Sequence, residues 1–355
     1  MATPFHRSKS GNVDSSSALA GEHPPVLVLY HPSMKTLARS LVHVTEERLL
    51  NLTEGERHRY RRVELCDCIR WGAFKDNWPD IFIDNVQGIA GRDVILLVSF
   101  DNPAVVFEQL SLIYHLPRYL IRSFRLILPF FPTATMERID KEGQIVTAKT
   151  MATLLSAIPL AARGPAQIFV FDIHALQERF YFSDTVIPRL LSAIPLLIQV
   201  LKKLPDSDNL SIAFPDEGAW KRFHSDLDQW PTITCIKVRG EGDNRMVSVR
   251  EGNPSGRHVV IVDDLVQTGG TLVECAKALH TGGASKISVF VTHPVFPKES
   301  WKKFMPRDES QVQFANFWIT DSIPHALEIV KNPPFKLISL CSVIADSLLG
   351  YDLVI

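Results

Sequence analysis

The chain has 355 residues, more than the roughly 250–300 residues at which a single hydrophobic core stops growing, so two domains are expected. Its apolar fraction of 46% and charged fraction of 22% are ordinary for a globular protein. The 38 basic residues nearly balance the 39 acidic ones, which excludes a global field that would attract nucleic acid or an anionic membrane.

The N-terminal segment and the most apolar stretch of the chain both lack the features of secretory and membrane sequences. Residues 1–24 are rich in Ser, Gly and Pro and contain no apolar run of signal-peptide type, so we predict a disordered tail. The stretch Val186–Leu204 is interrupted by Pro188 and Arg189 and is too short to span a bilayer. We therefore expect a cytoplasmic protein without a membrane partner.

The five cysteines are scattered, odd in number and without a CxxC pair, so neither a zinc ribbon nor a redox motif is expected. They are Cys66, Cys68, Cys235, Cys275 and Cys341. Cys66 and Cys68 alternate as strand residues do, and we interpret them as small apolar positions. This cysteine usage fits a reducing compartment.

In the first half of the chain, short apolar runs alternate with segments of helical periodicity. The expected strands are Val26–Tyr30, Val94–Phe100, Arg125–Phe131 and Gln167–Phe171. The expected helices are Met34–Val44, Val105–Ile121 and Thr147–Ser156. Apolar runs such as Val94–Phe100 are typical of strands that are buried on both faces of a sheet.

The same alternation occurs again in the second half. The expected strands are Leu210–Phe214, Thr232–Lys237, His258–Val262, Lys286–Val291 and Phe314–Ile319, and the expected helices are Gly218–Leu227 and Thr271–His280. These spacings predict α/β architecture with two parallel sheets flanked by helices. We expect an N-terminal domain over residues 25–185 and a C-terminal domain over 186–355. The apolar segment Ile338–Leu349 would pack back onto either domain.

One segment carries most of the chemical information. Residues 257–273 read RHVVIVDDLVQTGGTLV, in which an apolar strand leads to two acids, Asp263 and Asp264. Small and polar residues follow: Gln267, Thr268, Gly269, Gly270 and Thr271. Glycines let backbone N–H groups converge on one anion, and the helix that starts at Thr271 adds its positive end. We therefore expect a phosphate group in this loop.

The two acids before the loop suit a different part of the same ligand. Carboxylates repel phosphate but accept hydrogen bonds from the vicinal hydroxyls of a sugar. A phosphate and a diol at one strand end describe ribose 5-phosphate, and ligands of open α/β sheets bind at that edge. The alternative is an ordinary strand–turn–helix with solvated acids.

This loop resembles the binding motif of the phosphoribosyltransferases and of the ribose-phosphate diphosphokinases, also called phosphoribosyl pyrophosphate synthetases. Residues 171–182, FDIHALQERFYF, are similar to a segment of the synthetases that the transferases lack. The resemblance implies that His174, with Asp172 beside it, coordinates Mg²⁺ on the nucleotide phosphates. An imidazole and a carboxylate at a strand end suit such a cation.

Three further stretches are similar to the synthetases. The turn FPDEG at 214–218 implies that Asp216 contacts the ribose or its metal, and TDSIP at 320–324 resembles a turn near the end of family members. Lys237 and Arg239 match the start of a mobile catalytic loop, which implies that both stabilise charge on the transferring group. We expect residues 240–250 to be poorly ordered without nucleotide.

The nucleotide side departs from the usual family pattern. Family members carry Ala-Arg-Gln-Asp-Arg where this chain has ATMER at 134–138, so of the nucleotide contacts only Arg138 is expected. Residues 74–78, FKDNW, are the nearest equivalent of a segment through which a neighbouring subunit binds adenine, which implies roles for Phe74 and Asp76. These departures resemble the plant class II enzymes, which are implied to accept several nucleoside triphosphates. The basic run at 57–62 is interpreted as a solvated face.

The resemblance implies a homo-oligomeric, Mg²⁺-dependent enzyme that converts ATP and ribose 5-phosphate to phosphoribosyl diphosphate and AMP. Three alternatives stay open. A phosphoribosyltransferase would use the same loop, but the segment around His174 would have no task in it. A non-catalytic regulatory subunit would keep the fold and lose the active residues. A ligand-sensing regulator would have a degenerate loop and a DNA-binding surface, which the sequence lacks.

Overall fold

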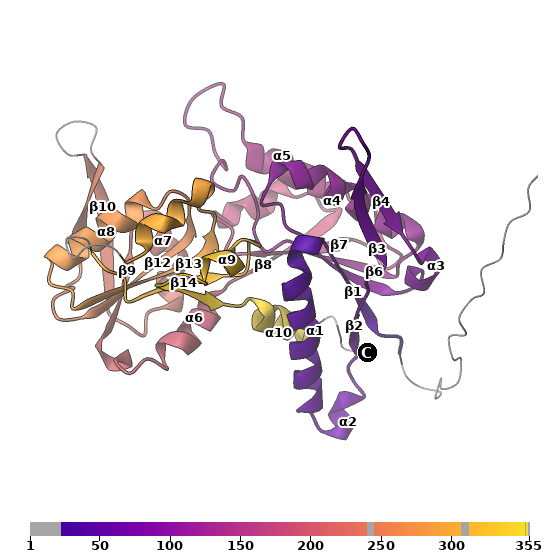
Figure 1. Ribbon diagram of the computed structural model, residues 1–355, viewed down its shortest axis with the longest axis horizontal. Helices are drawn as coiled ribbons and strands as arrows, with labels where there is room; N and C mark the ends of the chain where they lie inside the picture. The colour runs from indigo at the N-terminus through magenta and orange to yellow at the C-terminus, as the bar shows by residue number, and fades with distance from the viewer. Residues whose placement is uncertain (1–22, 240–244, 307–311, 352, 354–355) are drawn as a thin grey trace, which may run out of the picture.

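The computed structural model describes residues 23–239, 245–306, 312–351 and 353 (Figure 1). A six-stranded parallel sheet forms the centre of the first half, with the strand order β2-β1-β5-β6-β7-β8. Its strands are β1 (Val26–Tyr30), β2 (Val63–Leu65), β5 (Asp93–Leu97), β6 (Ser123–Ile127), β7 (Ala166–Phe171) and β8 (Val186–Leu191).

A second sheet of seven strands has the order β11-β10-β9-β12-β13-β14-β15. Its strands are β9 (Leu210–Phe214), β10 (Thr232–Arg239), β11 (Arg245–Glu251), β12 (His258–Val266), β13 (Lys286–Pro294), β14 (Asn316–Thr320) and β15 (Phe335–Ile338). All neighbours are parallel except β10 and β11, which form an antiparallel hairpin. The predicted α/β fold with two parallel sheets is confirmed.

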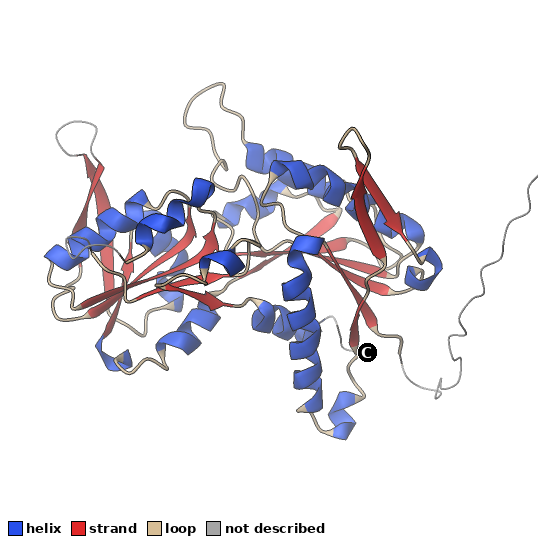
Figure 2. Cartoon of the chain, in the orientation of Figure 1, coloured by secondary structure: helices blue, strands red, loops and turns tan. Residues whose placement is uncertain are grey.

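Helices cover both faces of the two sheets, as Figure 2 shows. On one face of the first sheet lie α4 (Pro103–His115) and α5 (Thr147–Ser156), and on one face of the second lie α8 (Gly270–Thr281) and α9 (Ala326–Ile329). The opposite faces share one apolar core with α1 (Lys35–Leu50), α6 (Ile194–Leu201), α7 (Glu217–Phe223) and α10 (Cys341–Tyr351). Short helices α2 (Glu54–Arg57) and α3 (Val86–Ile89) and a separate hairpin, β3 (Ile69–Ala73) with β4 (Pro79–Ile83), complete the first half. No helix among the described residues is long and apolar enough to cross a membrane.

The continuous apolar runs of the strands follow from this double coverage. In β1, Val26 and Val28 face the core shared by the two sheets, whereas Leu27 and Leu29 face α4 and α5. All five residues of β1 are buried. Parallel sheets covered on both faces need such runs, because successive side chains point to opposite sides.

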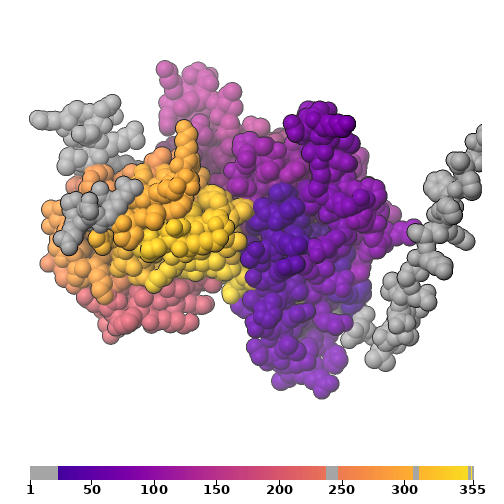
Figure 3. Space-filling model, in the orientation of Figure 1, coloured from indigo at the N-terminus to yellow at the C-terminus, as the bar shows by residue number. Residues whose placement is uncertain are grey.

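The C-terminal helix returns to the first half of the chain. α10 packs against α1, and in Figure 3 the C-terminal segment abuts α1 directly. Arg48 of α1 forms an ion pair with Asp346 of α10, and Arg189 of β8 donates a hydrogen bond of 2.8 Å to Ser347 Oγ. The last helix therefore ties the two sheets together.

The strand that follows the expected boundary between residues 185 and 186 belongs to the first sheet. β8 pairs in parallel with β7 and forms the edge of the first sheet. We therefore propose a boundary after Leu191. Pro188 obscured this strand in the sequence, but proline is tolerated on an edge strand because its missing N–H faces away from the ladder.

One interpretation of the sequence is wrong, and a second holds with one exception. Cys66 and Cys68 are joined by a disulfide, so they are not simply small apolar positions. The basic run at 57–62 is not uniformly solvated, since Arg61 is buried and pairs with Asp93. Burial alone would raise the pKa of Asp93, but hydrogen bonds from Arg122, Ser123 and Arg61 hold it well below its ordinary value.

Candidate active site

The predicted phosphate loop lies at the carboxyl end of β12. The strand is longer than expected and continues through both acids to Val266, and α8 begins at Gly270. Gly269 has a φ of +77°, and a Cβ there would lie 2.4 Å from Cζ of Phe304. Both the left-handed backbone and the neighbouring ring therefore require glycine at this position.

A cavity of about 380 Å³ opens beside this loop. It is lined by Thr268, Gly270 and Thr271 of the loop, and also by Val247 of β11 and Lys303. The first turn of the 12-residue helix α8 meets the cavity, so its N-terminal backbone N–H groups and Lys303 favour an anion there, although Glu274 also lines the cavity. Lys303 was missed in the sequence, because it follows the loop by more than thirty residues and belongs to no recognisable motif.

Three carboxylates gather next to the loop. Asp216 caps the N-terminus of α7, where its Oδ1 accepts a hydrogen bond of 3.1 Å from the N–H of Ala219. Burial, followed by the charges of Asp264 and Asp216, raises the pKa of Asp263 well above its ordinary value. The three predicted acids therefore come together, and their mutual repulsion favours a ligand with hydroxyl donors or a cation.

His174 reaches this cluster from the other domain. Its Nδ1 lies 2.6 Å from Oδ2 of Asp264, although the two residues are 90 positions apart. This hydrogen bond, more than any other contact, raises the pKa of His174 above its ordinary value. The structure thus joins the segment that resembles the synthetases to the phosphate loop.

Asp172, the other residue expected at the metal, lies in the interior between the two domains. Its side chain is fully buried, and its Oδ2 accepts hydrogen bonds from the N–H of Ala193 at 2.9 Å and from the hydroxyl of Thr292 at 2.7 Å. A φ of +32° turns the chain at this position. Through Oδ2, Asp172 fastens β7 to the second domain, while its Oδ1 lies 3.6 Å from the guanidinium of Arg222. The metal-binding role of Asp172 stays a prediction.

Two buried glutamates near His174 were not expected from the sequence. Glu178 Oε1 accepts a hydrogen bond of 3.0 Å from the N–H of Ala175, and its Oε2 has no hydrogen-bond partner among the described residues. Burial raises the pKa of Glu178 to about 7. Glu137, also buried, lies close enough to influence His174 and pairs with the exposed Arg138 at 3.5 Å. Through Glu137, Arg138 is linked to the surroundings of His174.

Lys237 and Arg239 end strand β10, and their side chains lie outside the described part of the structure. The backbone of Lys237 pairs with Val247, which lines the cavity at the phosphate loop. The expectation of a poorly ordered segment at 240–250 is wrong for 245–250, because β11 continues the sheet there. Residues 240–244 lie outside the described residues.

Phe74 and Asp76 do not join this site within one chain. They lie at the tip of the β3–β4 hairpin, where the N–H of Phe74 donates to the carbonyl of Trp78 at 2.8 Å. Figure 1 places this hairpin at the end of the first domain that is remote from the second sheet. A contribution to the nucleotide site would therefore have to come from another copy of the chain.

The residues present fit a divalent cation that is held mainly by its substrates. In the described parts of the chain, no group of three or more His, Cys, Asp or Glu side chains is arranged to hold a metal ion. Mg²⁺, however, commonly binds through one or two protein ligands together with water and substrate phosphates. His174 and the repelling acids Asp216, Asp263 and Asp264 supply such a partial ligand set.

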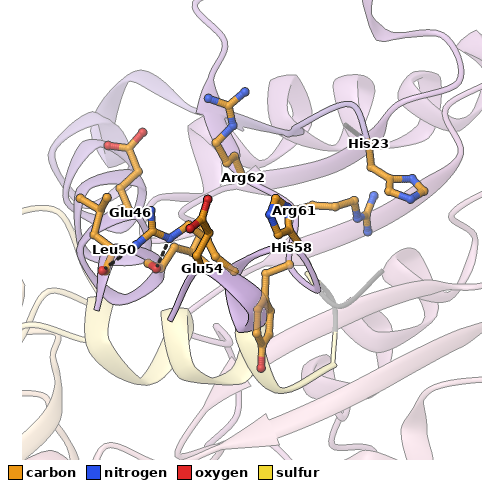
Figure 4. Close-up of a pocket in the computed structure, with 10 residues that line it drawn as sticks. His23, Glu46, Leu50, Glu54, His58, Arg61 and Arg62 are labelled. Carbon is orange, nitrogen blue, oxygen red and sulfur yellow. Dashed lines mark hydrogen bonds between the residues drawn. The ribbon is translucent and has the colours of Figure 1, made fainter. Parts of the chain in front are cut away.

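Another cavity of about 380 Å³ lies away from the strand ends, between α1 and the segment that leads into β2 (Figure 4). Leu50, Glu54, His58 and Arg62 are among its lining residues. The guanidinium of Arg57 donates to carbonyl oxygens at the end of α1, at 3.1 Å to Leu49 and 3.0 Å to Leu50. These bonds cap the helix, and we assign no catalytic role to this cavity.

The fold and the site define the class of protein first: a two-domain α/β protein with a glycine-containing loop at the carboxyl end of a central strand. The overall fold is similar to that of phosphoribosylpyrophosphate synthetase from Mycobacterium smegmatis, with a TM-score of 0.74 and 19% identity over 92% of this chain and 98% of that one. Residues 244–350 match the family model described as the phosphoribosyl synthetase-associated domain.

Relatives from plants place the chain more narrowly. It is 55% identical over 283 residues to ribose-phosphate pyrophosphokinase 3, mitochondrial, of Spinacia oleracea, which covers 79% of this chain and 70% of the relative. It is 53% identical over 283 residues to ribose-phosphate pyrophosphokinase 4 of Oryza sativa subsp. japonica, which covers 79% of this chain and 87% of the relative. The chain belongs to the ribose-phosphate pyrophosphokinase family and is of the plant class II type.

Proposed function

We propose that this chain transfers the diphosphoryl group of ATP to the C1 hydroxyl of ribose 5-phosphate, which yields phosphoribosyl diphosphate and AMP. The observation that carries the proposal is the contact of 2.6 Å between His174 and Asp264. It brings the motif that separates this family from the phosphoribosyltransferases onto the ribose-phosphate loop. A plain transferase would have no use for this contact.

Ribose 5-phosphate occupies the loop and the acids beside it in this proposal. The 5-phosphate is held by the hydroxyls of Thr268 and Thr271, by backbone N–H groups at Gly269 and Gly270, and by the positive end of α8. Gln267 opens the loop. The ribose hydroxyls donate to Asp263 and Asp264, and Asp216 lies near enough to influence both the sugar and its metal.

In this proposal ATP lies opposite the phosphate loop, on the side of the first domain. His174 is the protein ligand that we propose for Mg²⁺, and we propose that Arg138, which pairs with Glu137, contacts the nucleotide. The bound ion would neutralise the phosphate charge and orient the diphosphoryl group. In the free enzyme the proposed metal ligand His174 contacts Asp264 of the ribose site. In this proposal the contact breaks when the substrates bind.

The chemistry is an in-line displacement at the β-phosphorus. The C1 hydroxyl of the ribose attacks, the bond to the α-phosphate oxygen breaks, and AMP leaves with the electron pair. Such reactions depend on positioning and on charge stabilisation rather than on covalent help from the protein. We propose that Lys237 and Arg239 supply positive charge at the transferring group, since the backbone of Lys237 pairs with Val247, which lines the cavity.

We also propose that the working enzyme is a homo-oligomer. The hairpin tip that carries Phe74 and Asp76 is remote from the phosphate loop of its own chain. Exposed aromatic side chains at the hairpin, Phe74 at 56% and Trp78 at 59%, would be covered by a second copy. Size measurement by analytical ultracentrifugation tests this proposal, and a monomer at assay concentration would contradict it.

The cellular location remains a proposal as well. The spinach relative is named mitochondrial and one from Arabidopsis thaliana chloroplastic, whereas the rice relative's name gives no compartment. We propose a cytoplasmic enzyme. Microscopy of the full chain with a fluorescent protein at its C-terminus tests this, and fluorescence confined to an organelle would contradict it.

The direct test of the proposed function is AMP release by the purified chain with Mg²⁺, ATP and ribose 5-phosphate. AMP should appear only when both substrates are present. The matched controls are Asp264→Asn, which should lose activity, and Asp228→Asn, an exposed acid outside the site that should not. A regulatory subunit would release no AMP, and a phosphoribosyltransferase would need a nucleobase and preformed phosphoribosyl diphosphate.

A further inference from the structure

The disulfide between Cys66 and Cys68 takes no part in the proposed reaction. It closes a loop across a single residue, Asp67, with its two Cα atoms 5.3 Å apart. A loop this short restricts the unfolded chain very little, so the bridge adds little to global stability. Its position, between β2 and the β3–β4 hairpin, suggests a local role instead.

The bridge lies at the corner where the hairpin leaves the first sheet. On one side, the N–H of Cys66 donates to the carbonyl of Val28 in β1 at 2.9 Å. On the other side, the carbonyl of Cys68 accepts from the N–H of Asp84 at 2.9 Å, directly after β4. Asp67 between them accepts a hydrogen bond from the hydroxyl of Tyr30. The three-residue corner therefore joins the sheet edge to the base of the hairpin.

The inner part of the hairpin packs against the apolar core of the first domain through Ile69, Ile81 and Ile83. Its strands pair only with each other, and a two-stranded hairpin alone is marginally stable in water. Aromatic contacts hold its outer part: Trp71 meets His31 edge-on at 4.9 Å, and Trp78 meets Phe107 of α4 at 5.2 Å. Trp78 and Phe107 are each more than half exposed, so the tip of the hairpin is held less firmly than its base.

The bridge is also accessible to a reagent. A cavity of about 430 Å³ is lined by both cysteines together with Glu64, Asn85 and Arg92. Cys66 is half-buried, whereas Cys68 is buried at 9% exposure. An incoming thiolate can therefore reach the Cys66 sulfur first. The remaining cysteines, Cys235, Cys275 and Cys341, are buried thiols that such a reagent does not reach in the folded protein.

We propose that Cys66–Cys68 is a redox-active disulfide that a dithiol reduces in the folded enzyme. The thiolate of the dithiol attacks the Cys66 sulfur, the S–S bond breaks, and Cys68 leaves as a thiolate that takes up a proton. The second thiol of the reagent then attacks the mixed disulfide and releases Cys66. Two electrons and two protons pass to the protein, and the reagent leaves as a disulfide.

Reduction removes the covalent link at this corner, so the hairpin tip can shift relative to the first sheet. A consequence for catalysis rests on the proposed function, in which Phe74 and Asp76 at the hairpin tip bind the nucleotide of another copy of the chain. The reduced enzyme should therefore have a higher KM for ATP and an unchanged KM for ribose 5-phosphate, because the phosphate loop lies in the other domain.

The experiment compares air-oxidised and dithiothreitol-treated full-length protein by iodoacetamide labelling with peptide mapping and by hydrogen–deuterium exchange. In the native oxidised protein, Cys66 and Cys68 should not label; after mild reduction both should label, while the three buried thiols stay protected. Amides of residues 69–83 should exchange about threefold faster or more after reduction, with amides of β9 and β12 unchanged. Both readouts are independent of catalysis, so they stand even if the proposed reaction fails.

Cys66→Ser and Cys68→Ser variants serve as controls. Each should show the fast hairpin exchange without dithiothreitol and should no longer respond to it. Rapid labelling of Cys66 and Cys68 in the oxidised protein would overturn the inference, as would a bridge that resists dithiothreitol until the protein unfolds. Equal hairpin exchange in the oxidised and reduced forms would also refute the proposed device.

Discussion

Asp264→Asn removes the negative charge at the point where the two domains meet. The carboxylate has two partners: Oδ2 lies 2.6 Å from Nδ1 of His174, and Oδ1 accepts the N–H of Leu265 at 2.8 Å. Asparagine has nearly the same shape, and its single carbonyl oxygen can still accept from Leu265. The variant should therefore fold normally, and its effects should be confined to His174 and the bound sugar.

The expected magnitude follows from the hydrogen bonds that the charge supports. The Asp264 side chain is only 9% exposed, so water compensates poorly for a lost sugar-diol partner. Such a loss costs about 1–3 kcal/mol, which corresponds to a roughly 5- to 150-fold rise in the Kd for ribose 5-phosphate. Because the hydrogen bond to Asp264 is the largest cause of the raised pKa of His174, that pKa should fall toward its ordinary value of 6.5.

Two measurements test this variant. Isothermal titration of ribose 5-phosphate gives the Kd, and an NMR titration of the histidine ring signals gives the pKa of His174. Asp228→Asn, an exposed acid outside the site, is the control. Unchanged values of both quantities in Asp264→Asn would refute the assignment of Asp264 to the sugar and the contact with His174.

Three further predictions concern the rate, the nucleotide and the stability. Lys237→Ala should lower turnover at least about a hundredfold and change the Kd for ribose 5-phosphate less than about threefold, because the cation acts in the transition state. Lys203→Ala is the control. Near-normal turnover of Lys237→Ala would instead favour a non-catalytic regulatory subunit. Because Thr135 and Met136 stand where relatives carry Arg and Gln, GTP or CTP should support at least about a tenth of the ATP rate in a steady-state assay. Rates more than about a hundredfold lower would contradict loose base recognition. Asp93→Asn should lower the free energy of unfolding by about 3–5 kcal/mol in urea titrations at pH 7, since it leaves Arg61 buried without its anion. The pKa of Asp93 is depressed in the folded protein, so this stabilisation is present above the ordinary pKa of 3.8 and is lost as the pH falls toward the folded value; a constant difference between the two proteins down to pH 2 would contradict it.

Local sequence patterns were sufficient to predict the central strands and the strand, turn and helix around the expected phosphate loop. β1 and β9 have the predicted bounds, because a parallel strand covered on both faces must be apolar throughout. Edge strands gave weaker signals: Pro188 lies within β8, and charged residues stand at both ends of β11. An edge strand buries less surface and tolerates such residues, so its sequence carries less information about its structure.

Tertiary contacts determine which of the predicted side chains come together, and local sequence patterns do not show this. His174 and Asp264 were each predicted from a motif, but their contact depends on how the two sheets pack. Asp172 stands two positions before His174, yet its left-handed backbone turns it into the interior, where Thr292 binds it. Arg61 sits in a basic run and is buried nonetheless, because Asp93 lies beneath it in the sheet. Buried polar partners of this kind leave no periodic signal in the sequence.

The most direct test of the proposed reaction is ³¹P NMR of the products formed from Mg²⁺, ATP and ribose 5-phosphate. Attack at the β-phosphorus predicts equal amounts of AMP and phosphoribosyl diphosphate, with the latter's diphosphate signals coupled to each other and to the anomeric proton. Formation of ADP with a ribose bisphosphate would mean attack at the γ-phosphorus, and the proposed placement of the substrates would be wrong. An unchanged spectrum with active-site residues intact would contradict the assignment of catalysis to this chain.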